Sequence, residues 1–197
     1  MKIKYKYLIN EKTILFYGVY YENGELYTFV VHDDDVFLVA MPPMKLIDKT
    51  LMSYGSSFKG AIKSSQLLLG KNRKMYPIKI DASLDIWIFP TKSYKKENCV
   101  WFALNHVIDT KPQGVQFTKV FLTHGHTIEL AMKESAFREK RRNTDELKDK
   151  IVYNTKYSFR VDQPKIGFII VEKKGKYLCK NYDKNKVEMK KDGEKQY

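Results

Sequence analysis

The sequence predicts an α+β fold in which a largely antiparallel sheet carries a short helix pair at about residues 44–69 and a C-terminal helical segment at about residues 134–153. Three observations support this class. Apolar residues alternate with polar ones near the N-terminus, which is the period of a strand. Later apolar runs are short and separated by turn-forming residues, as in a meandering sheet. In the helix pair, apolar residues instead recur every three or four positions, and Phe137, Leu147 and Ile151 are the apolar anchors of the C-terminal segment.

The first 41 residues predict a four-stranded antiparallel meander. Ile and Tyr alternate with Lys in residues 3–9, and a second strand is expected at residues 13–20. Asn23-Gly24 predicts a two-residue hairpin turn, because Asn and Gly tolerate the positive φ that such a turn requires. The acidic turn Asp33–Asp35 then precedes a fourth strand at residues 36–40.

Two helices are expected to meet at a Gly-Ser-Ser turn. The first begins after two prolines, and its apolar residues lie three or four positions apart as far as Tyr54. Gly55 can end this helix because glycine tolerates the left-handed conformation. Ser56 and Ser57 can then accept the free backbone N–H groups at the start of a second helix, which runs to Leu69.

The remaining chain predicts strands, a helix and a tail. Strands are expected at residues 77–80, 85–89, 99–107, 115–122, 127–131, 157–161, 166–171 and 177–179. The helix from Glu134 to about Tyr153 is expected to break near Asn143, with Thr144 capping a second segment. Residues 181–197 hold almost no aliphatic side chains to repay an ordering cost of ~1 to 2 kcal/mol per residue. We therefore expect one domain at residues 1–180 and a mobile basic tail at 181–197.

Charge is distributed unevenly along the chain, whose formal net charge is +13 over 197 residues. Between Lys49 and Ile80 there are seven basic side chains and no acidic one. The acids cluster elsewhere, at Asp33–Asp35 and again at residues 145–149. Composition alone would have mixed the two signs, so the segregation favours a surface that binds a polyanion such as nucleic acid.

The basic segment supplies the candidate site. Lys and Arg neutralise phosphates, while serine hydroxyls and helix-terminal N–H groups can fix the register on a nucleic-acid backbone. The candidate DNA-binding residues are Lys49, Ser56, Ser57, Lys59, Lys63, Lys71, Arg73, Lys74 and Lys92. The alternatives to this DNA-binding surface are a solvated basic face without a partner and a helix-turn-helix. The apolar run Leu67–Leu69 does not favour the second, because a helix in the major groove needs polar side chains.

The residues of this region resemble a known family. The run IDKTLMSYGSSFKG, followed after the basic loop by a short strand and IFPT at residues 88–91, is similar to the competence transcription factor (ComK) family of Gram-positive bacteria. The resemblance extends from about Tyr5 to about Lys140, through the FLTHGHTIEL and ESAF segments, and fades after Arg141.

The resemblance implies a DNA-binding transcriptional activator of DNA-uptake genes. Family members recognise paired A/T-rich boxes, mainly through phosphate and minor-groove contacts, and Arg73 is the side chain best suited to a minor groove. The implied partners are double-stranded DNA, a second copy in a homodimer with two dimers on one site, and a proteolytic adaptor. The sequence offers no recognisable adaptor-binding peptide.

Other classes are weighed against this interpretation. Asp33–Asp35 and His124-x-His126 have the composition of metal ligands, but each occupies a predicted hairpin turn, where these residues are common. A metal-dependent phosphodiesterase using Asp33–Asp35 and His124 is the enzymatic alternative, and an RNA-binding module is the third. No nuclease or hydrolase motif appears, so we expect no enzyme, metal or cofactor.

Cellular location follows from the cysteines and the apolar runs. Cys99 and Cys179 have no partner at metal or CxxC spacing, so reduced thiols and a cytoplasmic, nucleoid-associated protein are expected. The N-terminus is charged, and no apolar run approaches the ~20 residues needed to cross a bilayer. No membrane partner is predicted.

Overall fold

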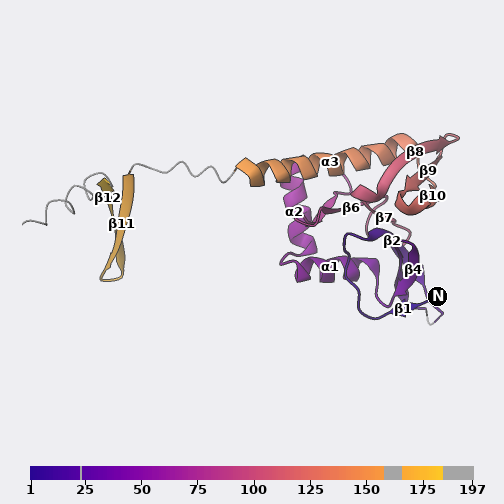
Figure 1. Cartoon of the computed structure of the whole chain (residues 1–197), viewed down its shortest axis with the longest axis horizontal. Helices are drawn as coiled ribbons and strands as arrows, with labels where there is room; N and C mark the ends of the chain where they lie inside the picture. Colours follow the sequence, from indigo (N-terminus) through magenta and orange to yellow (C-terminus); the bar gives the residue numbers. More distant parts are fainter. Residues whose placement is uncertain (23, 158–165, 184–197) are drawn as a thin grey trace, which may run out of the picture. The chain divides into compact units, whose positions relative to one another are not determined.

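The computed structural model describes residues 1–22, 24–157 and 166–183. The chain divides into two compact units, Met1–Lys156 and Tyr157–Tyr197, and each is described by itself. The first unit contains a seven-stranded sheet and a three-stranded sheet together with the helices (Figure 1). The predicted α+β class, with its largely antiparallel sheet, is therefore confirmed.

The larger sheet joins the N-terminal strands to those that follow the helix pair. Its strand order is β1-β4-β3-β2-β7-β6-β5. Its strands are β1 (Ile3–Lys4), β2 (Thr13–Tyr20), β3 (Leu26–His32), β4 (Asp35–Val39), β5 (Ile78–Asp81), β6 (Ile86–Pro90) and β7 (Trp101–Ala103). Because β2 pairs with β7, the two halves share one sheet.

The predicted four-stranded antiparallel meander is wrong in its first strand. β2, β3 and β4 do form an antiparallel meander, but β1 has two residues and pairs with β4 in parallel, with Ile3 opposite Leu38. After β1 the chain leaves the sheet, and the Tyr7 hydroxyl hydrogen-bonds to Thr13 Oγ1 (2.6 Å) and His32 Nδ1 (3.0 Å). The alternation of apolar and basic residues at 3–9 thus belongs to an irregular segment in which single side chains are buried, and not to a continuous strand.

The predicted helix pair is present as α1 (Pro43–Ser53) and α2 (Phe58–Leu69). Gly55 has φ +73°, and the backbone N–H of Ser56 donates to the Leu51 carbonyl (2.8 Å), which closes the end of α1. Ser57 caps α2 by accepting from the Gly60 N–H (3.2 Å). The second capping acceptor is Asp48 of α1, whose Oδ1 accepts from the Phe58 N–H (3.0 Å). Ser56, also predicted to cap α2, is not among these acceptors.

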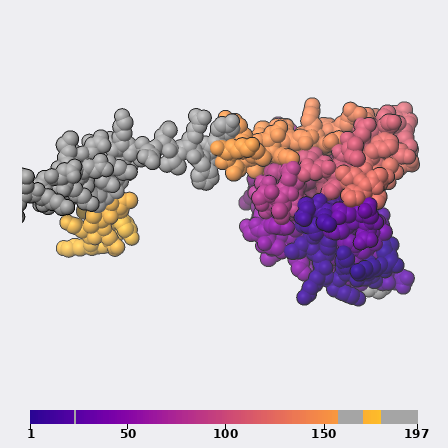
Figure 2. Space-filling model, viewed as in Figure 1, coloured from indigo at the N-terminus to yellow at the C-terminus, as the bar shows by residue number. Residues whose placement is uncertain are grey.

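Both faces of the larger sheet are covered, which explains why its central strands are apolar runs. Alternate residues of β6 and β7 enter different cores: Ile88 and Trp101 face the cluster that includes Leu46 and Ile47 of α1. Trp87, Phe89 and Phe102 face the opposite cluster, with residues of the smaller sheet and of the long helix. In the space-filling view, the orange and salmon segments lie as a layer along the first unit (Figure 2).

The smaller sheet consists of β8 (Val107–Gln113), β9 (Phe117–Leu122) and β10 (Thr127–Leu130), in the order β10-β9-β8. The strand predicted at residues 99–107 is wrong in its extent, because β7 ends at Ala103 and a turn of 3-10 helix, η1 (Leu104–His106), leads into β8. β8 itself was not predicted. Its sequence, VIDTKPQ, buries only Val107 and Thr110, so it lacks an apolar run.

The long helix α3 (Glu134–Tyr157) is continuous, and the predicted break near Asn143 is wrong. Thr144 does not cap a helix, because its side chain is fully buried and its hydroxyl donates to the Lys140 carbonyl (2.8 Å) within α3. Phe137, also fully buried, packs edge-on against Phe89 and Phe102, with ring centroids 5.5 and 5.2 Å away. Tertiary packing thus overrides the local break signal.

The second unit contains an antiparallel hairpin of β11 (Ile166–Lys173) and β12 (Lys176–Asp183), near the strands predicted at residues 166–171 and 177–179. β12 extends two residues past Asn181, the predicted start of the tail. Residues 158–161, predicted as a strand, and 184–197 lie outside the described residues. The boundary between the two compact units falls after Lys156. The domain predicted at residues 1–180 stays a prediction. No described helix is long and apolar enough to span a membrane.

Candidate nucleic-acid interface

The loop between α2 and β5, which we call the basic loop (residues 70–77), is held in place by a buried tyrosine. The Tyr76 hydroxyl donates to the Gly70 carbonyl (2.7 Å) and accepts from the Arg73 N–H (3.2 Å). Gly70 has φ +87°, a conformation that lets the chain leave α2 without strain on a side chain. Tyr76 therefore serves the core and the loop geometry and has no exposed face for stacking on bases.

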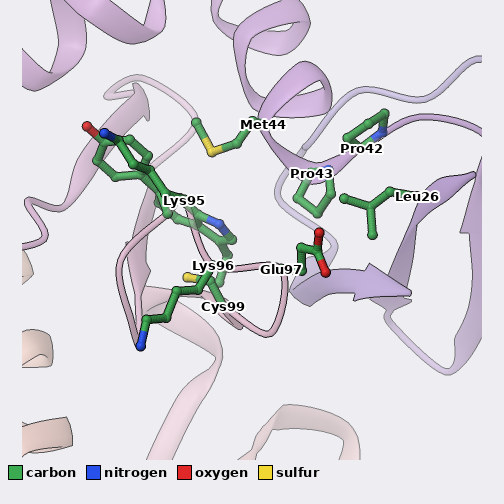
Figure 3. Close-up of a pocket in the computed structure, with 10 residues that line it drawn as sticks. Leu26, Pro42, Pro43, Met44, Lys95, Lys96, Glu97 and Cys99 are labelled. Atoms are coloured by element: carbon green, nitrogen blue, oxygen red, sulfur yellow. The ribbon is translucent and has the colours of Figure 1, made fainter. Parts of the chain in front are cut away.

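A second loop, residues 91–98, projects lysines beside the basic loop. Its base is closed by Thr91, whose N–H donates to the Val100 carbonyl (2.9 Å) and whose Oγ1 accepts from the Val100 N–H (3.0 Å). Tyr94 packs edge-on against Phe58 at the start of α2, with ring centroids 5.2 Å apart. Figure 3 shows the Lys95–Glu97 part of this loop near Pro43 and Met44, at the start of α1.

The two loops line two adjoining cavities that open to solvent, of about 420 and 610 Å³, which share Lys74, Met75 and Thr91, and α3 lines the first of them. We call them together the basic groove. Its basic lining residues are Arg73, Lys74, Lys92, Lys95, Lys96 and Lys140. Glu139 is the single acidic residue of the lining. Among the described residues, five of these six cations form no ion pair, and they face one carboxylate of the lining, so the groove has a positive potential that attracts a polyanion.

Arg73, predicted to read a minor groove, is bound to α3 in the free protein. Its Nη1 donates to Asn143 Oδ1 (2.6 Å), and its Nη2 lies 2.8 Å from Glu146 Oε2. Glu146 also accepts from Lys150 Nζ (2.8 Å), and the hydrogen bonds from Lys150 and Arg73 hold the pKa of Glu146 below its ordinary value. Arg73 would therefore have to exchange this carboxylate for a DNA acceptor.

Lys140 of α3 is half-buried at the wall of the groove. Its ammonium has Met75 Sδ as its hydrogen-bond acceptor in the described part of the chain, at 3.6 Å. Burial is the main cause that lowers the pKa of Lys140 below the ordinary value for lysine, because a desolvated ammonium is less stable. Within the described residues, it is a half-buried cation with no carboxylate bound to it.

The other candidate residues lie on the helix pair and at the tip of the basic loop. Lys49, on α1, is exposed, and so are Lys59 and Lys63, which are four positions apart and share one face of α2. Ser57 is occupied as the cap of α2, and Ser56 is half-buried. Lys71 is exposed beside Gly70. The structure therefore brings three of the nine candidates, Arg73, Lys74 and Lys92, into the basic groove.

Three groove residues were missed by the candidate list. Lys95 and Lys96 follow Lys92 in the run KSYKK, so the continuing basic run was a usable signal. Lys140 lies three positions after Phe137 and four before Thr144, both fully buried, so it shares their packed face, but the predicted helix break near Asn143 hid the spacing to Thr144.

The acidic and histidine turns, considered above as metal ligands, do meet in space. His124 Nδ1 lies 3.1 Å from Asp34 Oδ1, and His124 Nε2 lies 3.7 Å from Asp33 Oδ1. Asp33 also pairs with Lys12 at 3.2 Å. Among the described residues, no group of three or more His, Cys, Asp or Glu side chains is placed to hold a metal ion. These contacts tie the β3–β4 turn to the turn before β10.

Comparison with known proteins adds to this geometry. The model of the family described as "ComK protein" matches residues 4–156. A competence transcription factor of Bacillus subtilis (strain 168) is 29% identical over 140 residues, which cover 71% of this chain and 69% of that protein. No solved structure gives a significant match.

Proposed function

Because the chain belongs to the ComK family, we propose that it is a transcriptional activator of DNA-uptake genes that binds double-stranded DNA through the basic groove and the helix pair. The name of the Bacillus subtilis relative, competence transcription factor, supports this assignment. The observation that carries it is the lining of the groove by six basic side chains and one acid. Such a lining suits a phosphate backbone, which binds by releasing counterions from the duplex.

The basic residues divide into two roles. The exposed Lys49, Lys59, Lys63 and Lys71 can neutralise phosphates at any sequence, so they position the protein without specifying the site. Arg73 has a planar guanidinium suited to the narrow minor groove of A/T-rich DNA, where the negative potential is strongest. We propose that it supplies the preference for A/T-rich boxes once it leaves Glu146.

The binding unit is proposed to be a homodimer, with two dimers on one site. A two-fold dimer is matched by inverted A/T boxes, because each protomer then presents the same surface to its own box. We propose that the protein is cytoplasmic and associated with the nucleoid, which is where this activity would take place.

Protection mapping on a promoter fragment with two A/T-rich boxes tests the partner, the site and the stoichiometry together. We expect protection of both boxes and a plot of log K against log salt with a slope steeper than about −2, since each neutralised phosphate contributes about −0.9. A flatter slope, or equal protection of G·C-rich and A/T-rich fragments, would contradict the proposal. Competition with single-stranded RNA separates the duplex-binding function from an RNA-binding one.

A further inference from the structure

We infer that the cavity between the basic loop and α3 is a binding site for a single phosphate group, held principally by Lys140 and Lys74. The cavity has a volume of about 420 Å³, within the range of small-ligand sites. The phosphate has two conceivable sources, the backbone of bound DNA and a free nucleotide. The first source rests on the proposed function, whereas the second does not.

The donors around the cavity suit a phosphate. Lys74 and Lys140 supply ammonium groups, and Asn72 and Asn143 supply amides, while Arg73 is engaged by Glu146 and Asn143. Glu139 is the one acid of the lining, and it is exposed to solvent. Phosphate oxygens accept charge-assisted hydrogen bonds from several donors at once, which this arrangement permits.

Lys140 is the residue that most needs such a ligand. Its ammonium carries three N–H donors, yet the described contact is a thioether 3.6 Å away, and sulfur is a weak acceptor. Burial has removed part of its hydration, which is why its pKa is lowered. A phosphate oxygen in the cavity would replace the lost water and add a bound counter-charge to the attraction that Glu139 already exerts on the ammonium. No ion pair of Lys140 occurs in the part of the chain that the structure describes.

The position of the cavity connects it to the rest of the groove. Through Lys74, Met75 and Thr91 it continues into the second cavity, which is lined by Lys92, Lys95 and Lys96. A DNA strand following these lysines would place successive phosphates along one positive path. The cavity would then take the phosphate at the α3 end of that path.

The test compares full-length Lys140→Met with the full-length wild type. Methionine is chosen because it keeps the apolar stem of lysine and removes the charge. Lys156→Met is the matched control, since Lys156 is exposed on the same helix, about 24 Å away by helical rise. Duplex affinity is measured against salt for each protein, and AMP and inorganic phosphate are titrated separately by NMR. Thermal melting checks that each variant folds, and Lys140→Gln is the second variant if Lys140→Met does not.

If the phosphate belongs to DNA, the slope of log K against log salt should become shallower by about 0.9 in the Lys140 variant alone. Between about 50 and 200 mM salt, the affinity of this variant should then fall by a factor about 3.5-fold smaller than the factor for the wild type. A nucleotide source predicts an unchanged slope, with saturable AMP binding that the Lys140 variant alone loses. An unchanged slope, together with no AMP or inorganic phosphate binding that the Lys140 variant alone loses, overturns the inference, even where the wild type binds duplex DNA. If the wild type does not bind duplex DNA, but binds AMP and the Lys140 variant does not, the proposed function is refuted and the phosphate site still stands.

Discussion

Substituting Glu146 by Gln should raise the affinity of this protein for duplex DNA, because it removes the ion pair that Arg73 forms with α3 and leaves the weaker hydrogen bond to Asn143. Arg73 lies 2.8 Å from the Glu146 carboxylate, and DNA must displace that carboxylate before the guanidinium can contact it. Both side chains are about one-third exposed, at 32% and 35%. An ion pair this accessible to solvent contributes only about 0.2 to 1 kcal/mol. Removing it should therefore raise affinity by about 1.4- to 5-fold at low salt.

The assay is fluorescence anisotropy with an A/T-rich duplex, measured for the wild type and for Glu146→Gln. Asp149→Asn is the control, because it makes the same charge change at an exposed position of α3. We expect Glu146→Gln to exceed this control, and its gain to vanish in an Arg73→Ala background, since coupled residues deviate from additivity. Equal gains from the two acid substitutions, or a gain that survives without Arg73, would refute the proposed release.

Three further predictions concern groove reading, packing and pH. Lys59→Ala and Lys63→Ala should weaken binding to all duplexes alike, whereas Arg73→Ala should also lower the A/T preference in binding assays; identical profiles would contradict the division of roles. Phe137→Ala should destabilise the first unit by about 3 to 5 kcal/mol in urea unfolding, because a fully buried aromatic side chain is lost; a change below about 1 kcal/mol would mean that α3 is not anchored there. Burial raises the pKa of Asp85, but hydrogen bonds from a lysine, an asparagine and a tryptophan outweigh it and hold the pKa below the ordinary 3.8. Its stabilisation is then complete above that ordinary value and is lost as the pH falls through the folded pKa. The difference in melting temperature between the wild type and Asp85→Asn should thus be constant near neutral pH and shrink in acid; a difference that grows in acid would reverse the assigned sign.

Much of the fold was predictable because local and tertiary preferences agree there. The helix pair has apolar residues at helical spacing, a glycine with positive φ at Gly55 and a serine cap at Ser57, and all three signals proved correct. The failures occurred where the signals conflict. β8 is a polar strand that gains its partners from β9, and α3 passes through Asn143 and Thr144 because Thr144 is buried among neighbouring elements.

The site was predictable only in part, because its geometry depends on contacts between distant segments. The sequence indicates which residues are basic, but Arg73 and Asn143 are 70 residues apart, and no local pattern places them in contact. The pairing of Arg73 with Glu146 was hidden for the same reason. Lys140 belongs to a basic run on α3 in which Arg138 and Arg142 are exposed, and its partial burial reflects the contact with Met75 of the basic loop.

The pairing of Arg73 suggests why a groove rich in lysine could still discriminate between sequences. Of the six basic residues of the groove, Arg73 alone forms an ion pair within the described part of the chain. Under the proposed function, the lysines would gain from any phosphate, whereas Arg73 would gain only where DNA offers a stronger acceptor than Glu146. The narrow minor groove of A/T-rich DNA provides that stronger potential, and a wider G·C-rich groove does not.

Glu146 would then act against binding at the wrong sequence, which is a recognised route to specificity. We expect Glu146→Gln to increase affinity for a G·C-rich duplex by a larger factor than for an A/T-rich one, so that the ratio of the two affinities falls. Anisotropy titrations of both duplexes at one salt concentration measure this ratio directly. If the ratio stays constant while both affinities rise, Glu146 opposes DNA through its charge alone, and the A/T preference has to arise from another residue of the groove.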